Sequence, residues 1–401
     1  MIRFLTAGES HGPALIGILE GMPAGLEIEK AGIDADLIRR QGGYGRSGRQ
    51  RIEHDRVDIL TGLERDPNLN PAETPGGGRA GYPAAEQPGC AGLSIAGRTT
   101  GAPIALRIEN RDYANQVKRD KPTLTIPRPG HADLAGATKY RLDDMRTVLE
   151  RASARETAMR VAVGAIVKQL LAAFGMRVTS RTLEIGGISG GQADLRDLET
   201  CRRIEESQVR VADPTAERVI VERIDRARRD RDTLGGIFEV KVFGVPVGLG
   251  SYVQWDRKLD GCLAQAVMSI QAIKGVEIGD AFDVARSMGT LAHDQIVPGP
   301  KGPQRLSNRA GGLEGGVTNG EPLVVRAAMK PISTTLTPMR SIDVKTGDSA
   351  LAQYQRSDIC AVPAASVVGE AMVALVVADA FLEKFGGDSI AEICERYKWA
   401  P

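Results

Sequence analysis

The sequence predicts a layered fold of the α/β or α+β class, in which one or two apolar helices lie between sheets. Strand-like and helix-like segments alternate along the 401 residues, but without the steady strand–helix rhythm of a doubly wound sheet. Two helical segments, residues 150–174 and 363–385, are largely apolar, which indicates burial on several sides. No repeat of fixed period and no sharp change in composition divides the chain into halves.

Residues 1–63 are predicted to alternate short strands with a helix. Residues 2–6 have the pattern of a strand, and residues 34–40 that of a helix with Asp34 as its N-cap. Residues 65–95 are rich in Pro, Gly and Ala and have no apolar period, so we expect a long loop or an insertion there.

Longer elements are predicted in the rest of the chain. The helix over 150–174 is the clearest of them, and Gly175 is expected to end it. The predicted order is then strand 176–188, a charged, solvated helix around 221–232, strand 233–250, helix 258–273, strand 322–330 and helix 363–385, ending at Gly386 and Gly387.

Charge and cysteine usage argue against several classes of protein. The 52 basic and 51 acidic residues give a net charge of +1, whereas a general nucleic-acid binder has a basic excess. Arg outnumbers Lys by 39 to 13, and its planar guanidinium suits carboxylates and phosphates. No segment has the pattern of a transmembrane or secretory signal, and the five Cys form no CxxC pair. We therefore expect a protein of the reducing cytoplasm, with no membrane partner, no nucleic-acid partner and no metal site.

The motif GESHG at residues 8–12 fits the G-x-S-x-G nucleophile elbow of α/β-hydrolases. A strand precedes it, and residues 13–16 could open a helix. Only seven residues stand before the motif, which is too few to supply the oxyanion hole and the centre of a hydrolase sheet. Two glycines around a polar pair also suit a tight turn, in which small neighbours leave the ring of His11 accessible.

The motif GYGRSG at residues 43–48 fits the G-x-G-x-x-G dinucleotide fingerprint, but a helix-like segment precedes it where a strand is required. A loop rich in Arg is the better interpretation. Such a loop is either solvated or a clamp for a phosphate or a carboxylate. Its guanidinium groups belong to Arg39, Arg40, Arg46, Arg49 and Arg51.

Four further motifs carry groups that suit an anionic ligand. In RPGHAD at 128–133, His131 stands near Arg128 and Asp133. It is either a general acid toward a phosphate or a turn histidine capped by Asp133. ERASARET at 150–157 combines Arg with a predicted helix N-terminus. Glycine-rich and cationic turns follow at 308–316 and 330–334. Together they predict a glycine-lined, Arg-rich pocket for a phosphorylated ligand, and no P-loop or HExxH motif accompanies it.

In their order along the chain, these segments resemble the chorismate synthase family. The resemblance runs from the first residues to about residue 390, and it decides against the hydrolase and dinucleotide interpretations. The matching segments are GESHG (8–12), RRQGGYGRSGRQ (39–50), RPGHAD (128–133), ERASARET (150–157), QAIKGVEIGD (271–280), NRAGGLEGGVTNG (308–320), MKPIST (329–334) and RSDICAVPA (356–364).

The resemblance implies a single α+β domain over 1–401, a β-α-β sandwich of two sheets enclosing central helices, assembled as a homotetramer. Residues 65–95 would be an insertion atypical of the family. The implied reaction is the 1,4-anti elimination of phosphate from 5-enolpyruvylshikimate 3-phosphate to give chorismate, in the shikimate pathway of aromatic amino acid biosynthesis. It requires reduced FMN without net redox change. No flavin-reductase domain is visible, so NADPH would act only indirectly, through a separate reductase.

The resemblance also implies roles for individual residues. His11 matches a histidine that protonates the reduced flavin, His131 one that protonates the departing phosphate, and Asp358 an aspartate that helps the flavin accept the substrate proton. The implied FMN contacts are Arg151, Ala152, Ser153, Gln271, Ala272, Gly315, Lys330, Pro331, Ile332, Ser333, Thr334 and Arg356. The implied contacts to substrate or to NADPH phosphate are Arg40 and Arg46, with Ser10, Arg49 and Arg128 completing the substrate clamp.

Three rival functions are disfavoured by the combined motifs, and each would give a distinct experimental result. An FMN-dependent oxidoreductase would consume reducing equivalents, a G-x-S-x-G hydrolase would depend on Ser10, and a flavin-binding or anion-binding protein would have no turnover.

Overall fold

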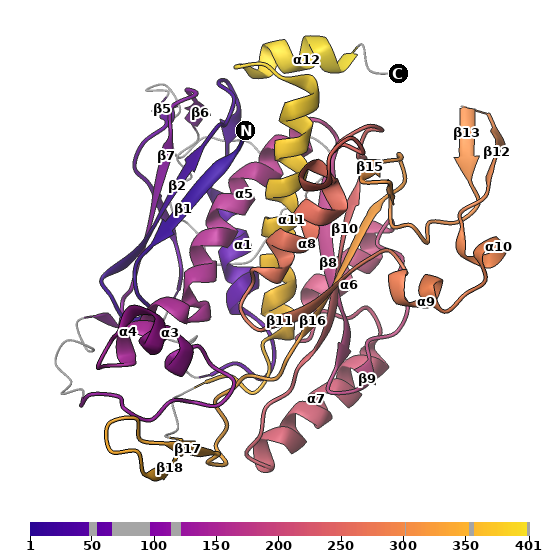
Figure 1. Ribbon diagram of the computed structural model, residues 1–401. Coiled ribbons are helices and arrows are strands. Elements are labelled where there is room, and N and C mark those ends of the chain that lie inside the picture. The colour runs from indigo at the N-terminus through magenta and orange to yellow at the C-terminus, as the bar shows by residue number, and fades with distance from the viewer. Residues whose placement is uncertain (48–53, 66–96, 114–121, 301, 353–356, 399–401) are drawn as a thin grey trace.

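Two antiparallel sheets enclose a layer of helices in the computed structural model, which describes residues 1–47, 54–65, 97–113, 122–300, 302–352 and 357–398 (Figure 1). The N-terminal sheet has the strand order β1-β2-β7-β4, and the larger sheet has the order β11-β16-β10-β8-β9. This arrangement confirms the α+β sandwich expected from the sequence.

The strands of the two large sheets come from two separate stretches of the sequence, 3–109 and 177–329. The first sheet contains β1 (Arg3–Ala7), β2 (Ala14–Glu20), β4 (Val57–Ile59) and β7 (Ile104–Glu109); the second contains β8 (Arg177–Ile185), β9 (Ile188–Ser189), β10 (Gly236–Phe243), β11 (Ile273–Ile278) and β16 (Leu323–Met329). Shorter pairings join β3 (Glu27–Ile28), β5 (Leu63–Arg65) and β6 (Gly97–Thr99); β12 (Ile296–Gly299) and β13 (Gly302–Arg305); β14 (Leu313–Glu314) and β15 (Val317–Thr318); and β17 (Arg340–Ile342) and β18 (Ser349–Leu351).

The described helices differ in how deeply they are buried. The central layer holds α1 (Lys30–Gln41), α5 (Thr157–Ala173), α8 (Leu259–Met268) and α11 (Val362–Phe385). The others are α3 (Asp133–Tyr140), α4 (Arg146–Ala152), α6 (Leu198–Glu206), α7 (Pro214–Arg229), α9 (Ala281–Ala285), α10 (Gly289–Ala292) and α12 (Ile390–Lys398).

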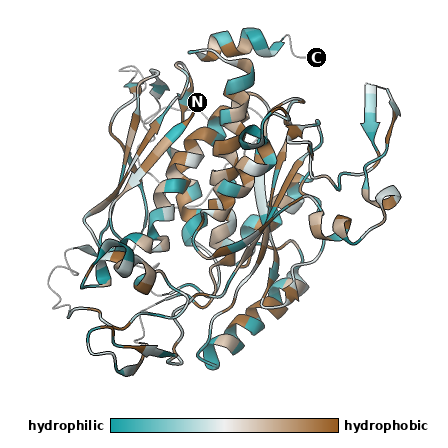
Figure 2. Cartoon of the chain, in the orientation of Figure 1, coloured by the Kyte–Doolittle hydropathy of each residue, from teal (hydrophilic) through white to brown (hydrophobic). Residues whose placement is uncertain are grey.

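The two apolar helices predicted from the sequence, α5 and α11, form the middle of the sandwich. Hydrophobic residues cover most of their surface (Figure 2), and one continuous apolar core surrounds them. Helix α11 is long and apolar enough to cross a membrane, but 89% of its most apolar stretch is buried inside the protein. The helices approach closely at Gly164, where an added Cβ would lie 2.3 Å from the Cβ of Ala371.

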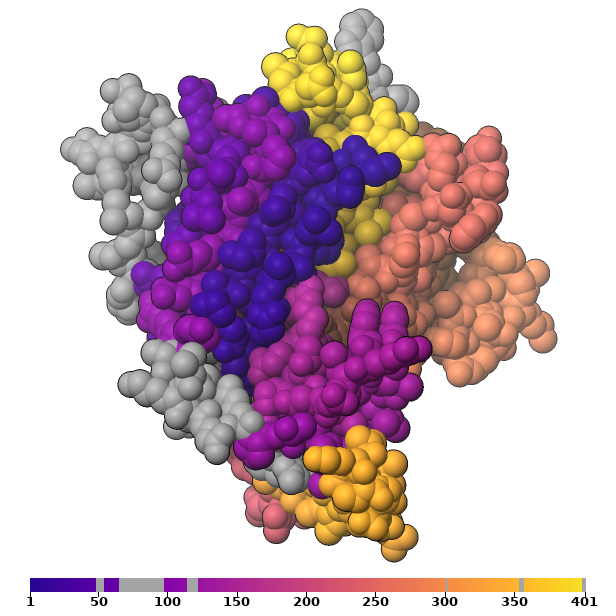
Figure 3. All heavy atoms as spheres, turned by 60° about the vertical axis from the view of Figure 1, so that its left-hand side comes forward, coloured from indigo at the N-terminus to yellow at the C-terminus, as the bar shows by residue number. Residues whose placement is uncertain are grey.

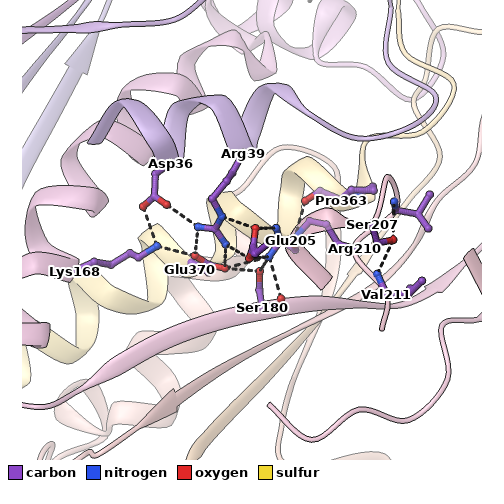
Figure 4. Close-up of polar contacts among 12 residues, drawn as sticks. Asp36, Arg39, Lys168, Ser180, Glu205, Ser207, Arg210, Val211, Pro363 and Glu370 are labelled. Carbon is purple, nitrogen blue, oxygen red and sulfur yellow. Dashed lines mark hydrogen bonds and ion pairs between the residues drawn. The ribbon is translucent and has the colours of Figure 1, made fainter. Parts of the chain in front are cut away.

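A cluster of six charges lies inside this helical layer (Figure 4). Glu370 is fully buried, and its carboxylate accepts hydrogen bonds from Arg39 at 2.7 and 2.8 Å, from Lys168 at 2.7 Å and from Ser180 at 2.7 Å. Burial opposes ionisation, but the charges of Arg39 and Lys168 outweigh it and hold the pKa of Glu370 well below its usual value. The cations Arg39, Lys168 and Arg210 balance the anions Asp36, Glu205 and Glu370.

The structure corrects two details of the predicted helices. The helix predicted from Asp34 begins at Lys30, so Asp34 is not its N-cap; its carboxylate instead accepts from Val57 N at 3.0 Å. The helix predicted over 150–174 is interrupted at Ser153, which is extended (φ −63°, ψ 140°) and separates α4 from a short 3₁₀ turn and α5.

Other boundaries also differ from the prediction. The strand predicted over 233–250 is regular only in β10, and the helix predicted over 258–273 ends at Met268, before β11. Residues 43–47 directly follow helix α1, where the fingerprint requires a strand, so the dinucleotide-fingerprint interpretation is wrong. The charged helix around 221–232 belongs to α7, which buries Ile220 and Ile224 and is therefore not solvated all round.

Other predicted features are confirmed. Gly175 ends α5 with φ +79°, its N–H bonded to Ala172 O and that of Met176 to Leu171 O, the pattern of a Schellman cap. The prediction of an insertion over 65–95 lies almost wholly outside the described residues.

Candidate functional site

The turn between β1 and β2 holds the first group of candidate residues. Gly8 has φ +106°, and an added Cβ would lie 2.4 Å from the carbonyl oxygen of Ala14, so the close approach of the chain requires glycine. A strand follows the turn, whereas a hydrolase elbow leads into a helix. The G-x-S-x-G motif is therefore a hairpin turn, and the hydrolase interpretation is wrong.

His11 lies in this turn and is bound by one acidic residue of α4. Its Nδ1 is 2.9 and 3.1 Å from the two carboxylate oxygens of Glu150, and its backbone N–H donates to Glu150 Oε2 at 2.7 Å. The carbonyl oxygen of Glu150 accepts from Ser10 N at 3.0 Å. One residue thus holds the turn through both its main chain and its side chain.

The interruption between α4 and α5 places a second residue against the same turn. Ser153 donates to the hydroxyl of Ser10 at 3.2 Å, and its own Oγ accepts from Arg155 N at 3.3 Å. Ser10 is only 2% exposed. The helix break that the sequence pattern did not predict is therefore part of the site, with Ala152 as the last residue of α4.

A buried network of polar side chains binds the backbone of the β1–β2 turn. Arg155 donates to Asn110 Oδ1 at 2.8 and 3.1 Å and to Asp55 Oδ2 at 2.6 Å. The amide nitrogen of Asn110 donates to the carbonyl oxygens of Gly12 at 2.7 Å and Glu9 at 3.3 Å. The position of the turn therefore depends on groups beside β4 and β7 and in the 3₁₀ turn before α5.

Arg40, expected to contact an anion, lies deep in this network. It is 5% exposed and donates to Ala154 O and Thr157 Oγ1, each at 2.9 Å, while its Nη1 lies 3.6 Å from Asp55 Oδ2. These contacts hold the start of α5.

The second histidine forms a compact cluster at the start of α3. Nδ1 of His131 is 2.5 Å from Asp133 Oδ1, and Arg128 donates to the same carboxylate from Nε at 2.8 Å and from Nη2 at 3.0 Å. Burial opposes ionisation of Asp133, but hydrogen bonds from His131 and Arg128, together with their charges, outweigh it and hold the pKa of Asp133 far below its usual value. Both site histidines thus face a carboxylate at Nδ1.

Residues 330–334 join this cluster to the rest of the site. Lys330 Nζ donates to the carbonyl oxygen of Gly130, and Arg128 Nη1 donates to Thr334 Oγ1 at 3.1 Å. Ser357 donates to the carbonyl oxygen of Thr334 at 2.9 Å. Pro331, Ile332 and Ser333 lie between these two anchors. At the lower end of the molecule the segment carrying α3 and α4 lies beside the β17–β18 hairpin (Figure 3), where Ser341 Oγ donates to Pro127 O at 2.6 Å.

Asp358 is bound by the loop that follows α1. Its Oδ2 is 2.8 Å from Arg46 Nη1, and its Oδ1 accepts from Ser47 N at 2.6 Å. The Nε of Arg46 is buried and has no partner among the described residues. Arg49 and Arg356, two further candidates, lie outside the described residues.

Gln271 connects the larger sheet to the N-terminal sheet. Its Nε2 donates to Glu156 Oε2 at 3.2 Å, and Thr6 Oγ1 donates to Glu156 Oε1 at 2.7 Å. Arg151 donates to the carbonyl oxygen of Thr6 at 2.9 Å. Burial opposes ionisation of Glu156, but Arg160 and these hydrogen bonds hold its pKa below the usual value.

Ala272 and Gly315, two further candidates for FMN contacts, both have a positive φ. Ala272 has φ +68°, a conformation that costs free energy for a residue with a Cβ, and its carbonyl oxygen accepts from Lys330 N at 2.9 Å. Gly315 lies in the turn between β14 and β15, with open space around an added Cβ except for Tyr252 Cβ at 3.9 Å. No hydrogen bond between described residues joins Gly315 to the other candidates.

The described hydrogen bonds connect most of the predicted residues. From His11 the contacts run through Glu150 and the neighbouring Arg151 to Thr6, Glu156 and Gln271. From Ala272 they run to Lys330, and residues 330–334 bind Gly130 and Ser357, the sequence neighbours of His131 and Asp358. Sequence reasoning missed Glu150 and Glu156, although both lie in a motif that it singled out. Asp55 and Asn110 gave no signal, because each stands among other polar residues in the sequence and no motif marks it.

Two clefts flank the site without containing either histidine. One of about 460 Å³ is lined by Pro13, Asn110 and Arg111, beside the β1–β2 turn. The other, of about 540 Å³, lies against α9 and β12, and Glu314 at its edge is next to Gly315.

Comparison with known proteins identifies one family. The family model described as chorismate synthase matches residues 2–70 and 87–382, and its gap falls within the segment predicted to be an insertion. The chain is 50% identical over 402 residues to a chorismate synthase of Syntrophotalea carbinolica, covering 98% of this chain and 96% of that protein. It is 51% identical over 393 residues to one of Salinispora tropica, with the same coverage of each chain.

A relative from Alkaliphilus metalliredigens, also a chorismate synthase, is 48% identical over 407 residues and covers 99% of both chains. Among solved structures, a crystal structure of a chorismate synthase is similar, with a TM-score of 0.75 and 41% identity, over 99% of this chain and 96% of that one. The similarity therefore extends over the whole sandwich and both histidine clusters.

Proposed function

The chain belongs to the chorismate synthase family of carbon–oxygen lyases, and on that premise we propose that it converts 5-enolpyruvylshikimate 3-phosphate to chorismate with reduced FMN. The overall change is the loss of phosphate and of one carbon-bound proton, with no net oxidation or reduction. The observation that carries the proposal is that residues 330–334 bind the segments that carry His131 and Asp358, through Gly130, Arg128 and Ser357. The main chain of Lys330 also binds Ala272, next to Gln271, which shares Glu156 with the strand before the His11 turn.

The two histidines supply proton chemistry at two places in this network. An imidazole ring can carry a proton and release it, so His131 suits the delivery of a proton to the departing phosphate. Arg128, beside it, adds a cation that suits an anionic leaving group. His11 and Asp358 take the other proton transfers, His11 on the flavin side and Asp358 at the proton that the substrate loses.

The described residues fit a flavin mononucleotide. Gln271 Oε1 is buried and has no partner in the described chain, so it suits an N–H donor such as the flavin ring carries. The strained backbone at Ala272 and the space at Gly315 allow the close approach of a flat ring. Arg151, Ser153, Lys330, Ser333 and Thr334 would hold the cofactor with Gln271, and when bound it supplies electron density that no side chain can provide.

The proposal has three further parts. NADPH acts only through a separate flavin reductase. The protein works in the cytoplasm, in keeping with the free thiols of Cys201, Cys262, Cys360 and Cys394. It forms a homotetramer, for which the exposed apolar side chains on and beside the α9–α10 arm, Phe282, Met288, Leu291, Ile296 and Leu306, provide a surface that another copy would cover. Light scattering of the purified protein tests the last part.

An anaerobic assay tests the activity. Purified protein is mixed with 5-enolpyruvylshikimate 3-phosphate and photoreduced FMN, while chorismate absorbance and free phosphate are followed together. We expect equal amounts of both products, many turnovers per flavin and no activity with oxidised FMN. Absence of product, or the oxidation of one reduced FMN for each chorismate formed, would contradict the proposal. A variant Ser10→Ala should retain more activity than His131→Ala, since Ser10 supports the turn and carries no proton transfer.

A further inference from the structure

Glu150 is the one acidic residue that binds both the backbone and the ring of His11 among the described contacts. We infer that it fixes His11 in the Nδ1–H tautomer and thereby makes Nε2 the ring atom that gains and loses the proton. Glu150 is then a positioning residue: it acts on the reaction through His11. The tautomer itself does not depend on the proposed function, whereas its effect on turnover does.

The chemistry of the two partners determines where the ring proton lies. An ionised carboxylate accepts hydrogen bonds and donates none, so a neutral imidazole that faces it at 2.9 Å places its N–H there. Oε2 is already engaged with the backbone N–H of His11 at 2.7 Å, which holds the carboxylate plane beside the ring. The remaining nitrogen, Nε2, is the acceptor in the neutral ring and the second donor in the charged one.

The surrounding backbone keeps the pair together. The carbonyl oxygen of Glu150 binds Ser10 N, so the residue before the histidine is fixed to the same helical turn. The extended conformation of Ser153 ends α4 at Ala152, and Ser153 then binds the hydroxyl of Ser10. The side chain of Glu150 is 13% exposed and that of His11 is 25% exposed, so the hydrogen bond between them is largely sheltered from water.

Replacing Glu150 by glutamine gives a sharp prediction, because an amide has one acceptor and one donor group. The backbone N–H of His11 can only donate, so it takes the amide oxygen. The NH₂ group then faces Nδ1, which must become an acceptor, and the proton moves to Nε2. In serine proteases the corresponding change, aspartate to asparagine, stabilises the wrong tautomer and reduces kcat about 10⁴-fold.

The experiment records long-range ¹H–¹⁵N spectra of the full-length protein labelled at its four histidines, at a pH where imidazole is neutral. The variant H11N assigns the His11 signals by their loss. We expect the Nδ1–H pattern in the wild-type protein and in E150D, the opposite pattern in E150Q, and no change in the control E20Q, whose carboxylate is on the exposed end of β2. An Nε2–H wild-type ring, or an unchanged ring in E150Q, would overturn the inference.

Turnover measurements on the same samples separate this inference from the proposed function. We expect E150Q to lose about 10²–10⁴-fold in chorismate formation and E150D to lose less. An inactive wild-type protein with an Nδ1–H ring would refute the proposed function and leave the tautomer assignment standing. An active E150Q protein with an inverted ring would show that the tautomer does not limit the reaction, and so would overturn the positioning role. If E150Q does not fold, E150D and the wild-type spectrum still decide the assignment.

Discussion

At the scale of single residues, the Arg128–His131–Asp133 cluster makes stability depend on pH. The pKa of Asp133 is depressed in the folded protein, so its contribution is complete above the unfolded value of about 3.9 and is lost as the pH falls below it. We predict that Asp133→Asn lowers the Tm at neutral pH, and that the Tm difference from the wild-type protein narrows as the pH falls below about 4. Thermal unfolding followed by circular dichroism at several pH values checks this.

The control for this prediction is Asp283→Asn, because the Asp283 side chain is 79% exposed on α9. Its Tm should follow that of the wild-type protein across the same pH range. If the Tm difference between Asp133→Asn and the wild-type protein stayed constant with pH, the ionisation of Asp133 would not be linked to folding.

The sequence predicted the candidate catalytic histidines better than the residues that hydrogen-bond to them. His11 and His131 stood out because the chain has only four histidines and because each lies in a glycine-flanked motif. Glu150 did not, since its role depends on a contact with a residue 139 positions away. Asp55 and Asn110 could not have been found from a local pattern, because a buried polar residue is recognised only when its partners are known.

At the scale of elements, the contact between α5 and α11 gives a prediction in which sterics oppose helix propensity. Alanine in place of Gly164 would gain about 1 kcal/mol of propensity, but its Cβ would lie 2.3 Å from Ala371 Cβ and 2.6 Å from Ala371 Cα. We expect Gly164→Ala to destabilise the protein, because two backbones would have to move apart. Gly32→Ala in α1 meets only a flexible Gln169 side chain at 3.5 Å and should stabilise by up to about 1 kcal/mol. Urea unfolding of both variants measures the two changes in stability. A Gly164→Ala variant as stable as the wild-type protein would contradict the prediction.

The buried charge cluster gives a second prediction for the same layer. Glu370→Gln leaves Arg39 and Lys168 without their shared carboxylate inside the core, so we expect a loss of about 3–5 kcal/mol in the free energy of unfolding. Glu383→Gln, on the exposed part of the same helix, should change it by less than about 0.5 kcal/mol. Denaturant titrations with a common m-value measure both, and an equal effect of the two changes would show that the cluster does not stabilise the helical layer.

Apolar patterns predicted the elements well where burial alone determines them. Helix α11 and strand β16 lie within one residue of their predicted bounds, since both are continuous apolar segments with clear ends. The break at Ser153 was missed because the residues around it favour a helix. Contacts of Ser153 and Arg155 with the β1–β2 turn and with Asn110 after β7 stabilise the interruption, and such contacts leave no periodic signal.

At the scale of the whole molecule, the two sheets share one core, and this predicts how the protein unfolds. The apolar cluster runs from Leu15 in the first sheet through α5 and α11 to Val325 in the second, so neither sheet can lose its partner layer and keep its own buried face. We therefore predict one cooperative transition, with a calorimetric enthalpy equal to the van't Hoff enthalpy at a fixed protein concentration. Glu370→Gln should move this whole transition to lower temperature, because Glu370 on α11 links α1, α5 and β8. Two separate endotherms, or a shift confined to one part of the melting curve, would show that the sandwich consists of two domains that unfold independently.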